Sequence, residues 1–339
     1  MVKEQVLSEM YAAYNGDCMD IMSRLKTGSV HFSCYSPPFM GLYHYSSSPQ
    51  DLSNCASKEE FLQQYEMHVA EIARVTMPGR ISAVHVTDVI GNDGELFDFP
   101  AEVKKIHKRH GFIHRNTITV WKEPLKVRMR TMVKSLMHKL IIEDATECFT
   151  AMPDYVLIFK KKGQNPVPVE HPFGLTHYAG ATPFLEMHKN QFGDYETFRK
   201  KWLAYDGDPR FNKLSHVTWQ RYASAVWDDV RIDNVLPFRD GKDPDDEKHV
   251  HPLQLDVVDR LVDMYTNPGE ICLTPYAGVG SEMFSPVSMG RRAIGAELKE
   301  SYFKQLKLNM KEAEKRFNES GQMVMQFDVE ESFIDIDMG

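Results

Sequence analysis

The sequence is poor in cysteine and has no apolar run close to the length that a membrane span requires. Its 339 residues include five cysteines that lie far apart and form no Cys-x-x-Cys pair. An odd, scattered set is typical of reduced thiols and argues against a disulfide framework or a zinc site. A spanning helix needs roughly 20 apolar residues, and the N-terminus lacks the apolar core of a signal peptide. We therefore expect a cytoplasmic protein with no membrane partner and no metal.

Net positive charge is also lacking, because the chain carries a formal net charge of −8. Five acidic residues after Gln326 contribute −5 of this charge, which leaves −3 for the remainder of the chain. The balance argues weakly against nucleic-acid binding, but the distribution of charge matters more than its sum. A basic face elsewhere is therefore compatible with the composition, and residues 321–339 are expected to form an acidic, disordered tail.

What the sequence does contain is an alternation of strand and helix patterns in two stretches. Residues 29–35 and 80–86 have the apolar, β-rich composition of strands, and residues 57–75 between them have helical apolar spacing. The alternation returns over residues 251–318. It predicts a Rossmann-like, doubly wound α/β sheet.

A rigid turn directly follows the first of these strands and has the sequence Ser36-Pro37-Pro38-Phe39. Proline has no N–H and fixes φ, so two prolines end the strand. In an open α/β sheet, ligands bind at the carboxyl ends of the strands. The Ser36 hydroxyl, the Pro37 carbonyl and the Phe39 ring would then share one small space, which suits a flat heterocycle with an exocyclic amino group. An ordinary proline-rich loop is the alternative interpretation.

A second ligand site is indicated by Gly278 and Gly280, which lie between a predicted strand at 270–273 and a predicted helix at 282–289. Glycines allow a sharp turn and the close approach of a ligand to the backbone. Glu297 ends the next strand, where an acid can accept hydrogen bonds from a ribose diol. No Gly-x-x-x-x-Gly-Lys sequence is present, so the pattern favours a nucleoside without a polyphosphate. A plain strand–helix turn with a surface glutamate is the alternative.

Taken in order, these motifs resemble those of the S-adenosylmethionine-dependent DNA amino-methyltransferases, which methylate cytosine N4 or adenine N6. The chain is similar to the β class of that family, in which the catalytic motif precedes the cofactor motif. The family's Ser/Asn/Asp-Pro-Pro-Tyr/Phe matches residues 36–39, and its Asp-Pro-Phe-x-Gly-x-Gly matches residues 275–280. The resemblance covers residues 14–124 and 251–316.

The resemblance implies S-adenosyl-L-methionine as the cofactor. A His-Pro-x-Gln before a helix is a family feature near the methionine end, and a Gly-Asp near the N-terminus lies by the adenine in relatives. Cofactor contacts are thereby implied for Asp17, His251, Gln254, Pro275, Tyr276, Ala277, Gly278, Gly280, Ser281 and Glu297. There are two departures. Thr274 stands where relatives often carry an aspartate near the methionine amino group, and Tyr276 replaces phenylalanine.

The resemblance also implies catalytic roles for Ser36, Pro37, Pro38 and Phe39. The target base would be flipped out of the duplex, with Phe39 stacked on it. Ser36 Oγ and the Pro37 carbonyl would accept the two amino hydrogens. A serine in the first position is commoner in cytosine-N4 members and an aspartate in adenine members of this class, which favours cytosine N4 over adenine N6.

The family context divides the chain into four predicted parts. Residues 1–124 form the catalytic half of the methyltransferase domain, and residues 251–320 form its cofactor-binding half. Residues 125–250 form an inserted target-recognition region, and the tail follows. Within the insert, three basic residues spaced by two would lie on one face of a strand and contact DNA: Lys126, Arg128 and Arg130. A solvated charged face is the alternative.

Other functions stay open at this point. The substrate implied by the family is double-stranded DNA, but related enzymes acting on RNA or on a protein glutamine would use a similar turn. A binding-only relative that no longer methylates is the alternative from another class. The family context also raises a cognate restriction enzyme and a homodimer as partners.

Overall fold

The computed structural model describes residues 2–38, 51–90, 95–131, 133–238 and 252–320. Within these ranges, nine strands form one sheet in the order β1-β2-β11-β10-β3-β4-β8-β7-β9, and β5 pairs separately with β6. The strands are β1 (Glu4–Leu7), β2 (Tyr11–Asn15), β3 (Val30–Tyr35), β4 (Thr76–Val86), β5 (Val89–Ile90), β6 (Leu96–Phe97), β7 (Phe112–Val120), β8 (Asp154–Lys161), β9 (Val226–Trp227), β10 (Ile271–Thr274) and β11 (Arg292–Glu297).

Most of the sheet is parallel. The run from β2 through β11, β10 and β3 to β4 is parallel throughout. Strand β8 is antiparallel to both of its neighbours, β4 and β7, and β1 is antiparallel to β2 at one edge. A mostly parallel sheet of this kind buries both of its faces and needs helices on each.

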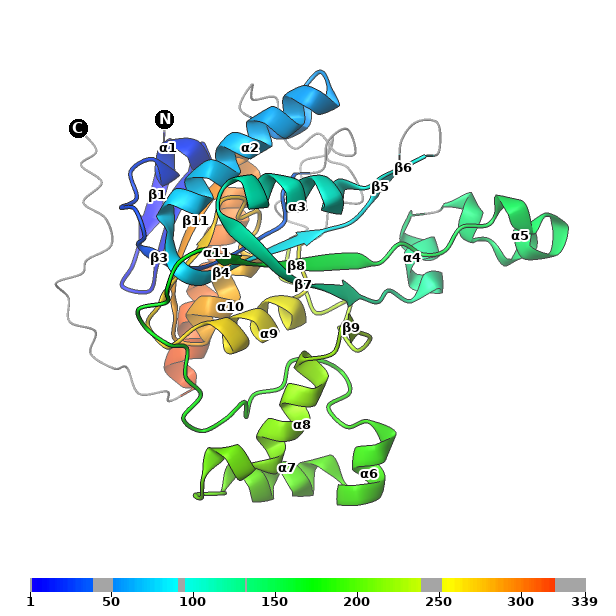
Figure 1. Ribbon diagram of the computed structural model, residues 1–339, viewed down its shortest axis with the longest axis vertical. Coiled ribbons are helices and arrows are strands. Elements are labelled where there is room, and N and C mark those ends of the chain that lie inside the picture. The colour runs from blue at the N-terminus through cyan, green and yellow to red at the C-terminus, as the bar shows by residue number, and fades with distance from the viewer. Residues whose placement is uncertain (1, 39–50, 91–94, 132, 239–251, 321–339) are drawn as a thin grey trace.

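Helices cover both faces of the sheet (Figure 1). On one face lie α1 (Cys18–Met22), α2 (Lys58–Val75) and α3 (Phe99–Arg109), and on the other lie α9 (Leu255–Tyr265), α10 (Ser281–Ser288) and α11 (Glu300–Glu319). The predicted doubly wound α/β architecture is therefore confirmed. None of the described helices is long and apolar enough to cross a membrane.

The topology marks one place in the sheet for a ligand. Strands β3 and β10 are neighbours, yet β3 continues through α2 to β4 while β10 continues through α10 to β11 on its other side. The chain therefore leaves the carboxyl ends of these two strands in opposite directions. Such a switch point opens a crevice at the sheet edge, where doubly wound proteins bind their ligands. Both predicted motifs directly follow these two strands.

The predicted insert at 125–250 does not form one continuous lobe. Its residues 154–161 form β8, which lies inside the sheet between β4 and β7, and its residues 226–227 form the edge strand β9. Four consecutive side chains of β8, from Val156 to Phe159, are fully buried because they face helix layers on both sides. Among the described residues of the insert, those outside the sheet include a helical arm and a separate helical lobe.

The arm contains α4 (Pro124–Thr131) and α5 (His138–Glu143), and it extends away from the sheet between β7 and β8 (Figure 1). The lobe contains α6 (Glu186–Phe192), α7 (Tyr195–Leu203) and α8 (Lys213–Tyr222). It has a small core of its own, formed by Phe184, Phe198, Leu214 and Val217.

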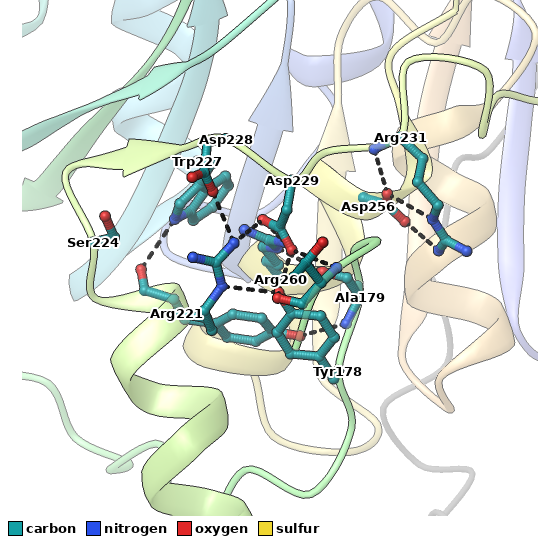
Figure 2. Close-up of polar contacts among 12 residues, drawn as sticks. Tyr178, Ala179, Arg221, Ser224, Trp227, Asp228, Asp229, Arg231, Asp256 and Arg260 are labelled. Carbon is teal, nitrogen blue, oxygen red and sulfur yellow. Dashed lines mark hydrogen bonds and ion pairs between the residues drawn. The ribbon is translucent and has the colours of Figure 1, made fainter. Parts of the chain in front are cut away.

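A buried ionic cluster joins the lobe to α9 (Figure 2). The Arg260 side chain of α9 is fully buried, and its Nη2 lies 2.7 Å from Asp229 Oδ1. Arg221 Nη2 of α8 lies 3.0 Å from the same oxygen. Arg260 Nε donates a 2.7 Å hydrogen bond to the carbonyl of Ala179, and its guanidinium lies 4.9 Å from the centroid of the Trp227 ring. The position of the lobe against the sheet is thus set by charges that water does not reach.

Candidate active site

A cavity of about 290 Å³ opens at the carboxyl ends of β3 and β10. It is lined by the turn after β3, the loop after β10 and the residues around the end of β11. Most of the predicted site residues line it: Asp17, Ser36, Pro37, Pro38, Gln254, Pro275, Tyr276, Ala277, Gly278, Ser281 and Glu297. Gly280 stands next to two lining residues but is not itself among them. Phe39 and His251 lie outside the described residues, as does the predicted tail.

The Ser36 hydroxyl donates a hydrogen bond of 3.0 Å to the carbonyl oxygen of His85 in β4. A hydroxyl has one hydrogen and two lone pairs, so this bond leaves its oxygen able to accept from a further donor. Pro37 and Pro38 continue the turn along the cavity wall. The turn therefore presents an oriented acceptor to the cavity.

The glycine loop and Glu297 form a single hydrogen-bonded unit. Glu297 Oε2 accepts a 2.8 Å hydrogen bond from the backbone N–H of Gly278, and its Oε1 accepts one of 2.7 Å from the N–H of Lys299. Gly278 has a φ of 53°, a left-handed conformation that glycine adopts without strain. Burial raises the pKa of Glu297 to about 7, although the two N–H donors oppose this shift. The carboxylate is thus fixed in direction and still has lone pairs for a diol.

Asp17 is held beside this unit by the pairing of β2 with β11. The N–H of Gly16 donates to the carbonyl of Glu297 at 3.0 Å, and Asn15 Nδ2 donates to the same oxygen at 2.8 Å. Asp17 caps α1, where its side chain accepts a 2.9 Å hydrogen bond from the N–H of Met19.

His68 is a cavity residue that the sequence did not indicate. Its Nδ1 lies 2.7 Å from the hydroxyl of Tyr276, and burial lowers the pKa of His68 to about 4. The extra hydroxyl of Tyr276, relative to the family's phenylalanine, therefore has a neutral imidazole partner on α2. The departure at Tyr276 was the available signal, because a buried phenol needs a hydrogen-bond partner.

A second unpredicted group lies beside Ser36. His85, Lys122 and Asp154 all line the cavity, and they come from the adjacent strands β4, β7 and β8 or their ends. His85 Nε2 lies 3.1 Å from Asp154 Oδ2, and Lys122 Nζ pairs with the other oxygen of that carboxylate. Burial alone would raise the pKa of Asp154, but the charges of Lys122 and His85 hold it well below its usual range. The group places an imidazole at the same sheet edge as the serine.

The cavity also contains polar atoms that no described residue satisfies. Gln254 Oε1 and Ser281 Oγ are buried in its wall and have no hydrogen-bond partner within the described ranges, and the same holds for Thr274 Oγ1 next to it. Buried polar atoms are normally paired, so these atoms fit a polar ligand that supplies the partners. Together with Glu297, they fit the predicted nucleoside cofactor carrying a polar tail.

The prediction of a basic strand at 126–130 was wrong. These residues belong to the helix α4, in which residues two apart point roughly 200° apart around the axis and do not share a face. Lys126 and Arg128 lie outside the wall of the main cavity, and Lys126 Nζ lies 3.4 Å from the exposed Asp233. Arg130 is in the same helix. The alternation of basic and apolar residues looked like a strand because α4 has little helical amphipathicity.

The chain was compared with known families and structures. The sequence profile described as DNA methylase (N6_N4_Mtase) matches residues 30–308. The type II methyltransferase M.MthZI of Methanothermobacter thermautotrophicus is 22% identical over 315 residues, covering 88% of this chain and 76% of the relative. M.BglII of Bacillus subtilis, also a type II methyltransferase, is 22% identical over 291 residues, covering 85% and 66% respectively.

Two solved structures share the fold. The PvuII DNA methyltransferase, which is cytosine-N4-specific, has a TM-score of 0.57 and 11% identity, covering 94% of this chain and 95% of its own. TTHA0409 of Thermus thermophilus, in complex with S-adenosyl-L-methionine, has a TM-score of 0.54 and 18% identity, covering 88% and 92%.

Proposed function

Because the chain belongs to the N6/N4 DNA methylase family and is an S-adenosylmethionine-dependent DNA methyltransferase, we propose that it methylates cytosine N4 in a specific duplex site, with adenine N6 as the alternative. The observation that carries the proposal is the single cavity shared by the Ser36 turn and the Gly278–Glu297 unit. One half offers acceptors for an amine and the other offers a carboxylate for a ribose. Ser36 favours cytosine, since an aspartate in that position is commoner in adenine members of this class.

At the base end, the chain's own residues orient an amine. The Ser36 oxygen, whose hydrogen is held by the His85 carbonyl, accepts one amino hydrogen, and the Pro37 carbonyl accepts the other. Both bonds draw the nitrogen lone pair out of conjugation with the ring and fix its direction, and positioning of this kind supplies much of a transfer rate. The amino group cannot reach this cavity from within a stacked duplex, so the base is flipped. Phe39 is proposed to stack on the flipped base.

At the cofactor end, Glu297 accepts hydrogen bonds from the ribose hydroxyls, and the backbone of the glycine loop lines the cavity beneath the ribose. Asp17 lies on the adenine side, whereas Gln254 and Ser281 face the methionine tail. S-adenosylmethionine supplies an electrophilic methyl group when it is bound. No strong base is required of the protein, because the amine becomes acidic only once it is methylated.

The proposal is tested with a labelled cofactor and duplex DNA, followed by analysis of the nucleosides. We expect N4-methylcytosine as the product. N6-methyladenine would support the alternative base, and label in neither nucleoside would contradict the proposal. RNA and protein substrates in the same assay separate DNA from other substrates.

The matched variant for this assay is Gly278→Trp. A Cβ at Gly278 meets no atom within 4 Å and Gly278 lines the cavity, so we expect the added indole to block it. Because a φ of 53° strains any side chain at this position, the thermal midpoint of the variant is compared with that of the wild type. We expect cofactor binding and methylation to be lost together while DNA binding persists. DNA binding with no cofactor binding by the wild type would instead identify a binding-only relative.

We further propose that the arm containing α4 contacts DNA phosphates. Its described helix contains Lys126, Arg128 and Arg130 and no acidic residue. The double variant Lys126→Ala/Arg128→Ala is expected to weaken DNA binding, because each lost phosphate contact reduces the slope of log K against log salt by about 0.9. The measurement is DNA affinity at several salt concentrations, and cofactor affinity should not change.

The double variant Lys311→Ala/Lys315→Ala is the matched control, since it also removes two cations and both lysines are exposed on α11. An equal loss of slope in both variants would show a general charge effect and count against a role for the arm. The cytoplasmic location, a cognate restriction enzyme and a homodimer stay predictions.

A further inference from the structure

Glu282 is an acidic residue that neither predicted motif assigns to a role. It lies in the first turn of α10, directly after the glycine loop, and it is 8% exposed. Its exposed part faces the cavity, because Glu282 is one of the lining residues. Within the described ranges, no lysine or arginine forms an ion pair with its carboxylate. A buried carboxylate without a cation is costly and needs an explanation.

The electrostatic surroundings of Glu282 are unfavourable to its charge. Burial and, to a lesser extent, the charge of Glu297 in the same cavity raise the pKa of Glu282 to about 8, against the effect of its own backbone N–H. On the strand β3, burial and then the charge of Glu282 raise the pKa of the Cys34 thiol. Glu297 on β11 therefore opposes the charge of Glu282, and the neutral Cys34 thiol on β3 offers it no counter-charge.

The two lysines among the described lining residues have other partners than Glu282. Lys122 pairs with Asp154 at the base end. The Lys299 Nζ lies 4.8 Å from the centroid of the Tyr302 ring. Neither of them contributes to the pKa of Glu282. The described lining residues thus offer the ionised form of Glu282 no counter-charge, which leaves a ligand to supply it.

We propose that Glu282 binds the α-ammonium group of the methionine moiety of S-adenosylmethionine. This inference rests on the proposed assignment of the cavity to that cofactor. The sulfonium is also positive but has no hydrogen to donate, whereas an ammonium has three. The neighbouring atoms without partners, Gln254 Oε1 and Ser281 Oγ, are acceptors that suit a group with several N–H donors. Thr274 has no charge to offer the ammonium, so Glu282 supplies it.

Binding of the ammonium by Glu282 has a definite pH dependence. Free Glu282 is largely protonated below pH 8, and an ammonium binds its ionised form. Binding therefore releases a proton below that pH, and affinity rises with pH by up to about tenfold per unit until the free carboxyl is ionised. Glu297, whose pKa is raised to about 7, lies in the same cavity and also affects the pH dependence of binding. Its contribution is the same for every ligand that carries the ribose, so a comparison of two such ligands isolates the contribution of Glu282.

The test uses calorimetric titration with two ligands, S-adenosylhomocysteine and 5′-methylthioadenosine, which share the adenine and ribose but differ in the amino-acid tail. In Glu282→Gln we expect affinity for S-adenosylhomocysteine to fall by roughly 10- to 100-fold and affinity for 5′-methylthioadenosine to stay within about threefold. Titration at pH 7 in buffers of different ionisation enthalpy should show that the wild type releases more protons on binding S-adenosylhomocysteine than on binding 5′-methylthioadenosine, and this difference should disappear in the variant.

Glu297→Gln is the contrasting variant, because loss of the ribose contact should weaken both ligands alike. Unchanged binding of both ligands to Glu282→Gln, or an equal loss for both, would overturn the role of Glu282 while leaving the cofactor site in place. If the wild type binds neither ligand, the proposed function fails together with this inference. A thermal midpoint of Glu282→Gln close to that of the wild type shows that the variant is folded.

Discussion

Replacing Ser36 with alanine is expected to lower the turnover number for DNA methylation by roughly 100- to 1,000-fold, as for removal of one group that stabilises charge in a transition state. The hydroxyl is held by the His85 carbonyl at 3.0 Å, and its free lone pairs accept an amino hydrogen. Positive charge develops on that nitrogen as it is methylated, so the acceptor is worth more in the transition state than in the bound state. The affinity for S-adenosylhomocysteine should stay within about twofold, because the interaction is absent from the cofactor end.

Two further variants make this result specific. Ser33→Ala removes a hydroxyl from β3, the strand that leads into the Ser36 turn. Ser33 Oγ donates to Ser82 Oγ at 2.7 Å and does not line the cavity. We expect it to leave turnover largely unchanged. Ser36→Asn should retain more activity than Ser36→Ala, since its amide oxygen is also an acceptor. Equal turnover in Ser36→Ala and the wild type would remove the serine from the mechanism.

The sheet around the site was predictable because the strand and turn patterns in the sequence match the strands and turns of the fold there. Apolar runs ending in prolines or glycines identified β3 and β10, and the C-terminal ends of parallel strands necessarily lie at one sheet edge. Glu297 was predictable for the same reason, since β11 is parallel to β10 and ends at that edge. Those elements need only local sequence and the rule for ligand sites in such sheets.

The parts of the site and fold that the sequence did not indicate depend on contacts between segments that lie far apart in the chain. His68 lies on α2 far from any motif, and only the pairing with Tyr276 places it in the cavity. Asp154 begins β8, and only the place of β8 between β4 and β7 brings this carboxylate to the cavity. Residues 11–15 carry no strand signal beyond five apolar, aromatic or small polar residues, yet they form β2 because β11 offers a free edge.

Asp229→Ala is expected to destabilise the folded chain by about 3–5 kcal/mol, the range found when one member of a buried ion pair is removed. The Asp229 carboxylate lies 2.7 Å from Arg260 Nη2 and 3.0 Å from Arg221 Nη2. Without it, the fully buried Arg260 loses its counter-charge, whereas Arg221 keeps its pair with the exposed Asp228. The free energy of unfolding, measured by denaturant titration, checks the prediction.

The neighbouring residue provides the control. Asp228 pairs with the same Arg221 at 2.8 Å, but its side chain is 60% exposed, so Asp228→Ala should cost no more than about 1 kcal/mol. Similar losses for the two variants would show that burial of the cluster does not govern its energy.

The pH dependence gives an independent check with a definite sign. Burial by itself would raise the pKa of Asp229, but Arg260 and the hydroxyl of Tyr178 hold it below its usual value. A carboxyl whose pKa is lowered by folding contributes stability above its unfolded pKa of about 3.9 and loses it as the pH falls through the folded value. The stability difference between the wild type and Asp229→Ala should therefore be full at pH 7 and shrink below pH 4. Asp229 thus joins the helical lobe to α9, the helix whose N-cap is the cavity residue Gln254.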